Sequence, residues 1–248
     1  MKAILLAAGF STRLYPLTEY FPKGLLEVGG KSISGYVMDE LVKLPEVDEI
    51  VLVTNHRYVE HFINWVKNEY KNYSIQIIDD CATHKDERLG AIGDLQLVIE
   101  QKGWQNEDIL VLSSDTLSSL KLSEFVDFFE SHHGVINAVY DTKDKEIIRE
   151  KLGCVTLDQD KIVQFIEKPS EPEGTLTSIP YYIFPKEASA LVTQYLSEGN
   201  SADAPGSIIS WLIDKLPVYG FQTKGYYYDV GTKEVYERLK VDFSSLIK

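Results

Sequence analysis

Residues 1–33 read MKAILLAAGFSTRLYPLTEYFPKGLLEVGGKSI, and they indicate how the rest of the chain is organised. The apolar run 3–8 has the length of a buried strand, and glycine, serine and threonine follow it within residues 9–12. A strand that ends in such a turn can wrap an anion with its backbone N–H groups, because small side chains let the main chain approach closely. Arg13 and Lys23 add cationic donors that suit polyphosphate. The stretch therefore predicts a phosphate-binding loop at the end of a sheet.

Residues 6–33 also resemble the signature of the sugar-1-phosphate nucleotidylyltransferases, for example glucose-1-phosphate thymidylyltransferase. Enzymes of this family join a nucleoside triphosphate to a sugar phosphate and release pyrophosphate. Ser11 replaces a glycine of the family pattern and Ser32 replaces a proline, and both keep a small side chain. Residues 89–94, LGAIGD, resemble a family stretch against which the base packs. The resemblance implies these nucleotide-binding residues: Leu6, Ala8, Gly9, Ser11, Thr12, Arg13, Lys23 and Gly90.

Downstream, the hydrophobic pattern alternates between the two-residue period of strands and the 3.6-residue period of helices. This alternation predicts a Rossmann-like three-layer α/β/α sandwich around a mostly parallel sheet. We expect strands at 48–54, 74–78, 108–113, 135–140, 179–184, 218–221 and 226–228, and a hairpin at 154–169. We expect helices at 33–44, 58–70, 91–101, 123–131, 186–196, 207–215 and 232–239.

Two aspartates are candidates for a metal site. Attack by a phosphate oxygen on an α-phosphorus needs in-line positioning and charge neutralisation, and Mg²⁺ held by one or two carboxylates suits the second task. Asp115 follows the apolar run 109–112 after two serines, and that strand should end at the same sheet edge as Gly9. Asp229 belongs to a stretch that resembles the family's closing motif, in which Thr232 caps a helix. We expect Asp115 and Asp229 to bind Mg²⁺; the alternative for each is an ordinary solvated turn.

The second half of the chain carries the expected acceptor-binding residues. Glu167 and Lys168 resemble the family's Glu-Lys-Pro motif, which implies that the glutamate binds sugar hydroxyls and the lysine binds the sugar phosphate. The alternative is a solvated ion pair. Gly153 matches a glycine that lets main chain approach the sugar. Ser178 stands where the family often has asparagine, and Pro180 removes a backbone donor nearby, so we expect an unusual acceptor pocket.

Composition limits the class of protein. The net charge of −13 argues against nonspecific binding to nucleic acid, which needs a basic face. Cys81 and Cys154 lack metal-ligand spacing and favour a reducing compartment. The first apolar run is shorter than that of a signal peptide, and no run would span a membrane. We expect a cytoplasmic protein, compatible with a homo-oligomer, whose single domain (1–248) binds the nucleotide with about residues 1–150 and the acceptor with about 151–248.

The sequence thus predicts a Mg²⁺-dependent transfer of a nucleotide from a nucleoside triphosphate to a sugar 1-phosphate. Arg13, Lys23 and Asp115 are the predicted catalytic residues. No general base is expected, because the acceptor phosphate has a second pKa of about 6 and is already ionised. One alternative is a cytidylyltransferase for an alcohol phosphate such as phosphocholine. Another is a non-catalytic nucleotide-binding regulatory protein on the same fold.

Overall fold

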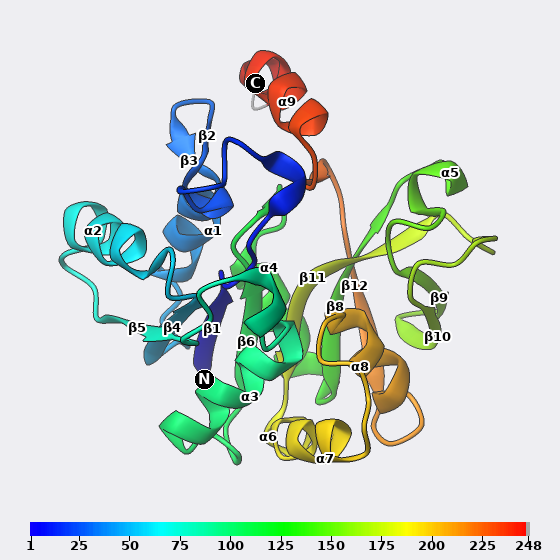
Figure 1. The fold of residues 1–248 in the computed structure, drawn as a ribbon. Helices are drawn as coiled ribbons and strands as arrows, with labels where there is room; N and C mark the ends of the chain where they lie inside the picture. Colours follow the sequence, from blue (N-terminus) through cyan, green and yellow to red (C-terminus); the bar gives the residue numbers. More distant parts are fainter. Residues whose placement is uncertain (247–248) are drawn as a thin grey trace.

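The computed structural model describes residues 1–246 and arranges them around a nine-stranded sheet (Figure 1). From one edge to the other, the strand order is β5-β4-β1-β6-β11-β8-β12-β10-β9. Only β10 and β11 run against the direction of the other seven strands, so the expected mostly parallel sheet is confirmed. In spatial order the strands are Ile75–Asp79, Glu49–Thr54, Lys2–Leu6, Ile109–Ser113, Leu176–Phe184, Val135–Asp141, Val218–Thr223, Lys161–Ile166 and Cys154–Asp158.

Helices cover both faces of this sheet, which gives the expected three layers (Figure 1). Successive residues of a strand point to opposite faces, and β1 serves both cores in this way. Ala3 and Leu5 pack with α1 (Ile33–Leu41), α2 (Val59–Glu69) and α4 (Leu122–His132). Ile4 packs on the other face with α3 (Ala91–Lys102), α7 (Leu191–Ser197) and α8 (Pro205–Leu212).

Most expected elements are confirmed within a few residues, and the differences have local causes. The helix expected at 186–196 is divided into α6 (Lys186–Ser189) and α7, although Ala190 between them keeps helical dihedral angles. Strand β11 begins earlier than expected, at Leu176, and its pairing with β8 is irregular between Ser178 and Tyr182. Pro180 lies in this interval and cannot donate a ladder hydrogen bond, which explains the irregularity.

Several short elements have no counterpart in the expectations. They are too brief to give a hydrophobic period, and pairing partners or turns define them instead. They are β2 (Glu27–Val28), β3 (Lys31–Ser32), β7 (Thr116–Ser118), α5 (Lys145–Ile148) and the 3₁₀ turns η1 (Thr12–Leu14), η2 (Lys23–Leu25) and η3 (Lys85–Glu87). Strand β13 (Tyr227–Asp229), which was expected, pairs with β7 in a separate two-stranded sheet.

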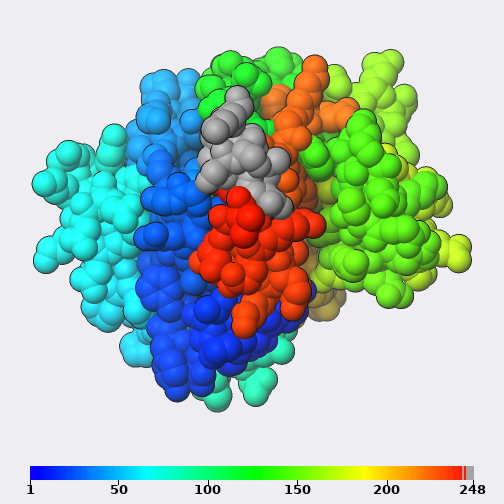
Figure 2. All heavy atoms as spheres, turned by 90° about the horizontal axis from the view of Figure 1, so that it is seen from above, coloured from blue at the N-terminus to red at the C-terminus, as the bar shows by residue number. Residues whose placement is uncertain are grey.

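The last helix, α9 (Lys233–Leu246), is longer than the expected 232–239. Tyr236, Leu239 and Phe243 form one buried stripe on it and pack in a third apolar cluster with residues of the N-terminal segment such as Leu14. Figure 2 shows this helix lying beside the N-terminal segment. Burial of the stripe accounts for the extra turns. Within residues 1–246, no helix combines the length and the apolar character needed to cross a membrane.

Phe243→Ala tests how strongly α9 is held. The Phe243 side chain is fully buried and lies edge-on to the rings of Tyr36 and Tyr226, at centroid distances of 5.3 and 5.7 Å. Truncating such a phenylalanine costs about 3–5 kcal/mol. Val241 on the same helix is 79% exposed, so Val241→Ala should change stability by less than about 0.5 kcal/mol. Urea unfolding of both variants measures the contrast, and equal losses would contradict the packing described here.

Candidate active site

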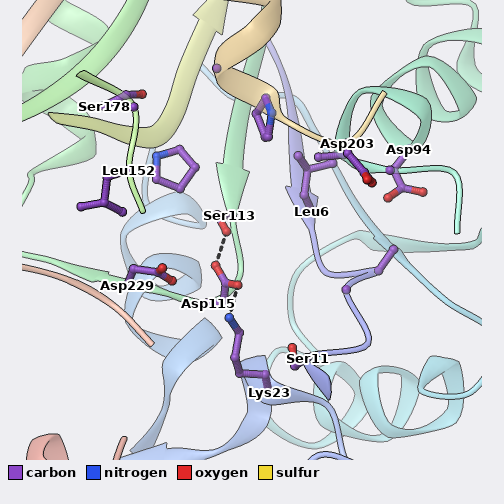
Figure 3. Close-up of a pocket in the computed structure, with 18 of the residues that line it drawn as sticks. Leu6, Ser11, Lys23, Asp94, Ser113, Asp115, Leu152, Ser178, Asp203 and Asp229 are labelled. Atoms are coloured by element: carbon purple, nitrogen blue, oxygen red, sulfur yellow. Dashed lines mark hydrogen bonds and ion pairs between the residues drawn. The ribbon is translucent and has the colours of Figure 1, made fainter. Parts of the chain in front are cut away.

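A cleft of about 570 Å³ lies where β1 and β6 end, and residues from both halves of the chain line it (Figure 3). The parallel register pairs Leu6 with Ser113, so the segments that follow both strands emerge together. All the predicted catalytic, binding and metal residues line this cleft except Lys168: Leu6, Ala8, Gly9, Ser11, Thr12, Arg13, Lys23, Gly90, Asp115, Gly153, Glu167, Ser178 and Asp229. Their common location is therefore observed, whereas their individual roles stay predictions.

The loop after β1 is fixed through its carbonyl groups. Asn55 Nδ2 donates to the carbonyl of Ala8 at 2.8 Å, and Thr18 Oγ1 donates to the carbonyl of Ser11 at 2.8 Å. The hydroxyl of Tyr58, a fully buried residue, donates to the carbonyls of Phe10 and Thr18. Because side chains outside the turn satisfy these acceptors, the turn is held in shape without using its own N–H groups. That arrangement suits the binding of an anion.

Ser11 adopts the left-handed backbone conformation, with φ 48°. This conformation favours glycine, and it explains why the related family pattern has glycine at this position. A serine tolerates it at a modest energetic cost. The departure from the pattern noted in the sequence therefore leaves the shape of the loop intact.

Lys23 and Asp115 form an ion pair at the floor of the cleft. Lys23 is buried at the start of η2, and the hydroxyl of Ser113 donates to the second oxygen of Asp115. Burial opposes ionisation of Asp115, but the charge and hydrogen bond of Lys23 outweigh it and hold the pKa of that carboxyl below its usual value. The Asp115 carboxyl is therefore ionised at neutral pH.

Gly24 lets these two segments approach each other. A Cβ atom on Gly24 would lie 2.3 Å from the hydroxyl of Ser34 and 3.1 Å from the carbonyl of Ser114. Ser34 Oγ donates to that same carbonyl at 2.9 Å. The glycine after Lys23 thus has a packing role, which places Lys23 next to the end of β6.

Asp229 reaches the same place through β13, which pairs with β7 so that Asp229 is opposite Thr116. The carboxylate of Asp229 and the guanidinium of Arg13 both lie close to Gly231. A Cβ atom added to Gly231 would be 3.0 Å from Asp229 Oδ2 and 3.4 Å from Arg13 Nη2. Burial raises the pKa of Asp229, Lys23 opposes the rise, and the negative charge of Asp115 adds to it. The carboxyl groups of Asp115 and Asp229 therefore repel each other, and the positive charge of Lys23 only partly offsets the burial and repulsion at Asp229.

Such a donor set fits a hard divalent cation. Magnesium ions use oxygen ligands and are commonly bound through one or two carboxylates together with substrate phosphates. Residues 1–246 contain no cluster of three or more histidine, cysteine, aspartate or glutamate side chains that could hold a metal. The protein thus offers Asp115 and Asp229, and further ligands would have to come from substrate and water.

In the second half of the chain, the ring of Phe165 packs against two glycines. Cβ atoms on Gly153 and Gly206 would lie 2.5 and 2.4 Å from Phe165 Cζ, and the one on Gly206 would lie 2.5 Å from Glu167 Oε2. Glu167 therefore lies against the N-terminus of α8, where the helix dipole favours a carboxylate. Lys168 is exposed, with its Nζ 3.6 Å from Glu167 Oε1, and does not line the cleft.

Sequence reasoning missed several charged residues of the cleft. Arg88 binds Asp203 through two hydrogen bonds of 3.0 and 2.6 Å, which join the loop before α3 to the loop before α8. Gly90 has φ +83°, and a Cβ atom there would lie 2.6 Å from the carbonyl oxygen of Ala202. The close approach of these two loops, together with the positive φ, explains why residue 90 is a glycine. The missed cleft residues with charged side chains are Lys85, Arg88, Asp94, Lys151 and Asp203.

Asp94 is nine-tenths buried and interacts with Asp80, which is buried behind it. Burial, with the negative charge of Asp80, raises the pKa of Asp94 to about 8. Burial raises the pKa of Asp80 to about 6, although the backbone N–H of Ala82 opposes that rise. At neutral pH the two carboxyl groups therefore hold a proton between them.

Comparison with known proteins agrees with this geometry. The family model described as nucleotidyl transferase matches residues 2–244. The chain belongs to the nucleotidyl transferase family. It is 29% identical over 234 residues to a mannose-1-phosphate guanyltransferase of Candida albicans, covering 93% of this chain and 61% of that protein. It is 30% identical over 234 residues to the bifunctional protein GlmU of Methanocaldococcus jannaschii, covering 93% of this chain and 51% of that protein.

The nucleotidyl transferase chain thus spans between about half and about three fifths of the length of these curated relatives. Among solved structures, a UDP-glucose pyrophosphorylase complexed with UDP-glucose superposes with a TM-score of 0.78 at 18% identity. The match covers 98% of both chains. At this identity the likeness shows the fold, and it confirms the expected Rossmann-like α/β architecture.

Asp94→Asn tests the protonated pair. Between the unfolded pKa of 3.8 and the folded pKa of about 8, the folded protein binds more protons than the unfolded chain, so its stability falls as pH rises. Asparagine does not titrate, so the variant does not lose stability in this way as the pH rises. The free energy of unfolding of the variant minus that of the wild type should be about 2–4 kcal/mol larger at pH 8 than at pH 5. Urea unfolding at both pH values measures this, with Glu100→Gln on the exposed part of α3 as control. A gain independent of pH would contradict the assignment.

Proposed function

We propose that this chain transfers a nucleotide from a nucleoside triphosphate to a sugar 1-phosphate, giving a nucleoside diphosphate sugar and pyrophosphate. The convergence of Arg13, Lys23, Asp115 and Asp229 on one cleft carries the proposal. These residues come from three separate segments of the chain, and a fold without a polyphosphate ligand has no need to bring them together. Family membership supports the same chemistry.

The nucleoside triphosphate binds with its phosphates on the loop after β1. Arg13 lies against the β and γ phosphates, and Lys23 lies by the α-phosphate. When bound, Mg²⁺ supplies positive charge to the phosphate oxygens, and Asp115 and Asp229 would hold it. Lys23 is already paired with Asp115, so its ammonium is fixed before substrate arrives and needs little reorganisation during the reaction.

The acceptor enters from the side of Gly153, Glu167 and Ser178, which line the cleft, and the exposed Lys168 lies next to Glu167. A phosphate oxygen of the acceptor attacks the α-phosphorus in line, the bond to the β-phosphate breaks, and pyrophosphate leaves. The acceptor oxygen is ionised near neutral pH and needs no general base. Holding both reactants in one cleft supplies the orientation that this displacement requires.

We assign the nucleotide to the first half of the chain, about 1–150, and the acceptor to about 151–248, in one functional unit. Both cysteines are free thiols, which suits a reducing compartment and supports a cytoplasmic protein. The partners in this proposal are small molecules, and the net charge of −13 is unsuited to nucleic acid.

A second candidate keeps the chemistry and changes the acceptor to an alcohol phosphate such as phosphocholine, with CTP as donor. It is favoured by Pro180 and Ser178 in the acceptor wall and by the position of Lys168 outside the lining. Pyrophosphate release, measured over a panel of nucleoside triphosphates against sugar 1-phosphates and alcohol phosphates, separates the two. Nucleotide binding without release for any acceptor would instead support a regulatory protein.

Lys23→Ala and Asp115→Asn should each lower kcat for pyrophosphate release about a hundredfold or more, because each removes a charge from the reacting phosphates. Lys31→Ala is the matched control. Lys31 belongs to the same N-terminal segment but pairs with Asp39 outside the cleft, so its loss should leave kcat nearly unchanged. Near-native turnover in both cleft variants would refute the assigned roles.

Removal of divalent metal should abolish pyrophosphate release, and added Mg²⁺ should restore it, because two carboxylates and a polyphosphate carry more negative charge than Arg13 and Lys23 balance. Asp229→Asn should raise the Mg²⁺ concentration needed for half-maximal rate, since it removes one of the two carboxylate ligands. A titration of the rate with Mg²⁺ measures this. Full activity in the presence of a chelator would contradict the assigned metal site.

A further inference from the structure

The proposed reaction leaves two buried carboxyl groups unused, those of Asp80 and Asp94. Asp80 follows β5, and Asp94 belongs to the first turn of α3; their exposed fractions are 8% and 6%. Asp80 Oδ1 accepts a hydrogen bond of 2.7 Å from the N–H of Ala82. Asp80 Oδ2 and Asp94 Oδ1 are buried without a donor among the described residues. Such a pair destabilises the fold, so its retention calls for a functional reason.

A shared proton accounts for the two orphaned oxygens. The carboxyl groups interact with each other, and two carboxylates so placed cannot both ionise. One proton between Asp80 Oδ2 and Asp94 Oδ1 leaves the pair with a single negative charge. The other oxygen of Asp94, Oδ2, then carries no shared proton and can accept a hydrogen bond, and Asp94 lines the cleft.

The position of Asp94 identifies the part of the ligand it meets. In Figure 3, Asp94 and Asp203 lie on one side of Asp115, near Leu6, whereas Leu152 and Ser178 of the acceptor wall lie on the other side. Asp94 therefore lies on the side of the cleft opposite Leu152 and Ser178. With the phosphates on the loop after β1, the base is the portion of the nucleotide left to occupy this side.

Among residues 1–246, no cation pairs with Asp94. Arg88 lines the same side of the cleft, but its guanidinium is held by both oxygens of Asp203. Within residues 1–246, no ion pair involves Asp80 or Asp94. A ligand that brings N–H donors would supply what the carboxyl lacks.

We propose that Asp94 selects guanine as the base of the nucleotide, an inference that rests on the proposed function. Guanine presents two adjacent donors, N1–H and the 2-amino group. In adenine and cytosine the amino group adjoins a ring nitrogen that is an acceptor, and in uracil and thymine two carbonyl oxygens flank the single N–H. A negatively charged acceptor therefore faces only donors when the base is guanine.

Guanine binding also gives the pair a consistent proton balance. The N–H donors of the base stabilise the ionised form of Asp94. The shared proton then moves from Asp94 to Asp80, and the total charge of the pair stays at −1. No proton enters or leaves the site, and the hydrogen bonds from the base offset the preference of the proton for Asp94.

Calorimetric titration with GTP, ITP and XTP tests the inference. ITP lacks the 2-amino group, and XTP replaces it with a carbonyl oxygen. The wild type should bind GTP tenfold to a hundredfold more tightly than ITP, the range of a charge-assisted hydrogen bond, and should bind XTP least. Asp94→Asn should weaken GTP by a similar factor and should bind XTP at least as tightly as GTP, because the amide can donate to that carbonyl. Glu100→Gln should behave as the wild type.

Equal wild-type affinity for GTP and ITP, tighter binding of a triphosphate with another base, or unchanged GTP affinity in Asp94→Asn would overturn the inference. Circular dichroism checks whether Asp94→Asn is folded, and XTP binding provides a gain that misfolding cannot produce. A measurement of pyrophosphate release distinguishes failure of the proposed nucleotide transfer from failure of guanine selection by Asp94. Release driven by another nucleotide supports the transferase and overturns guanine selection, whereas GTP selection without release from any acceptor supports the base site and overturns the transferase.

Discussion

The ion pair between Lys23 and Asp115 joins the two segments on which the cleft depends. A lysine with its side chain buried is costly unless an opposite charge stays within contact distance. That charge is available because the parallel register of β1 and β6 brings the residues after both strands to one edge. Gly24 allows the approach, and the hydrogen bond from Ser34 to Ser114 fixes it. The pair therefore holds a charged group in position before any ligand binds.

The position of the second carboxylate, Asp229, depends on a small two-stranded sheet. Asp229 is brought to Asp115 by β7 and β13, which have three residues each and form their own small sheet. Two such short strands would not be stable alone. They are supported by the apolar cluster that contains Leu117, Val230 and the buried stripe of α9. The end of the chain thus contributes to the geometry of the cleft without reaching it.

Much of this arrangement is predictable from sequence, because long periodic segments give long elements. The N-terminal strand, its loop and the helices that follow were expected within a few residues, and Asp115 was expected at the edge where it lies. Asp229 could be located only through its resemblance to a family motif, since its partner strand is more than a hundred residues away and too short to have a period. The contact of Gly90 with Ala202 and the pairing of Asp94 with Asp80 leave no pattern in the sequence, because they depend on how loops and a buried pair meet in space.

The position of the antiparallel strand β11 limits how this chain can be divided into independent parts. It lies between β6 and β8, so a strand from the second half of the sequence separates two strands from the first. A fragment ending near residue 150 would leave β6, whose residues Ile109–Leu112 are almost wholly buried here, with an unpaired apolar edge. Open edges of this kind associate with other chains. The two halves of the sequence share one sheet, because β11 is inserted between β6 and β8. A half exchanged with that of a relative would therefore have to pair correctly with the strands on both sides of β11.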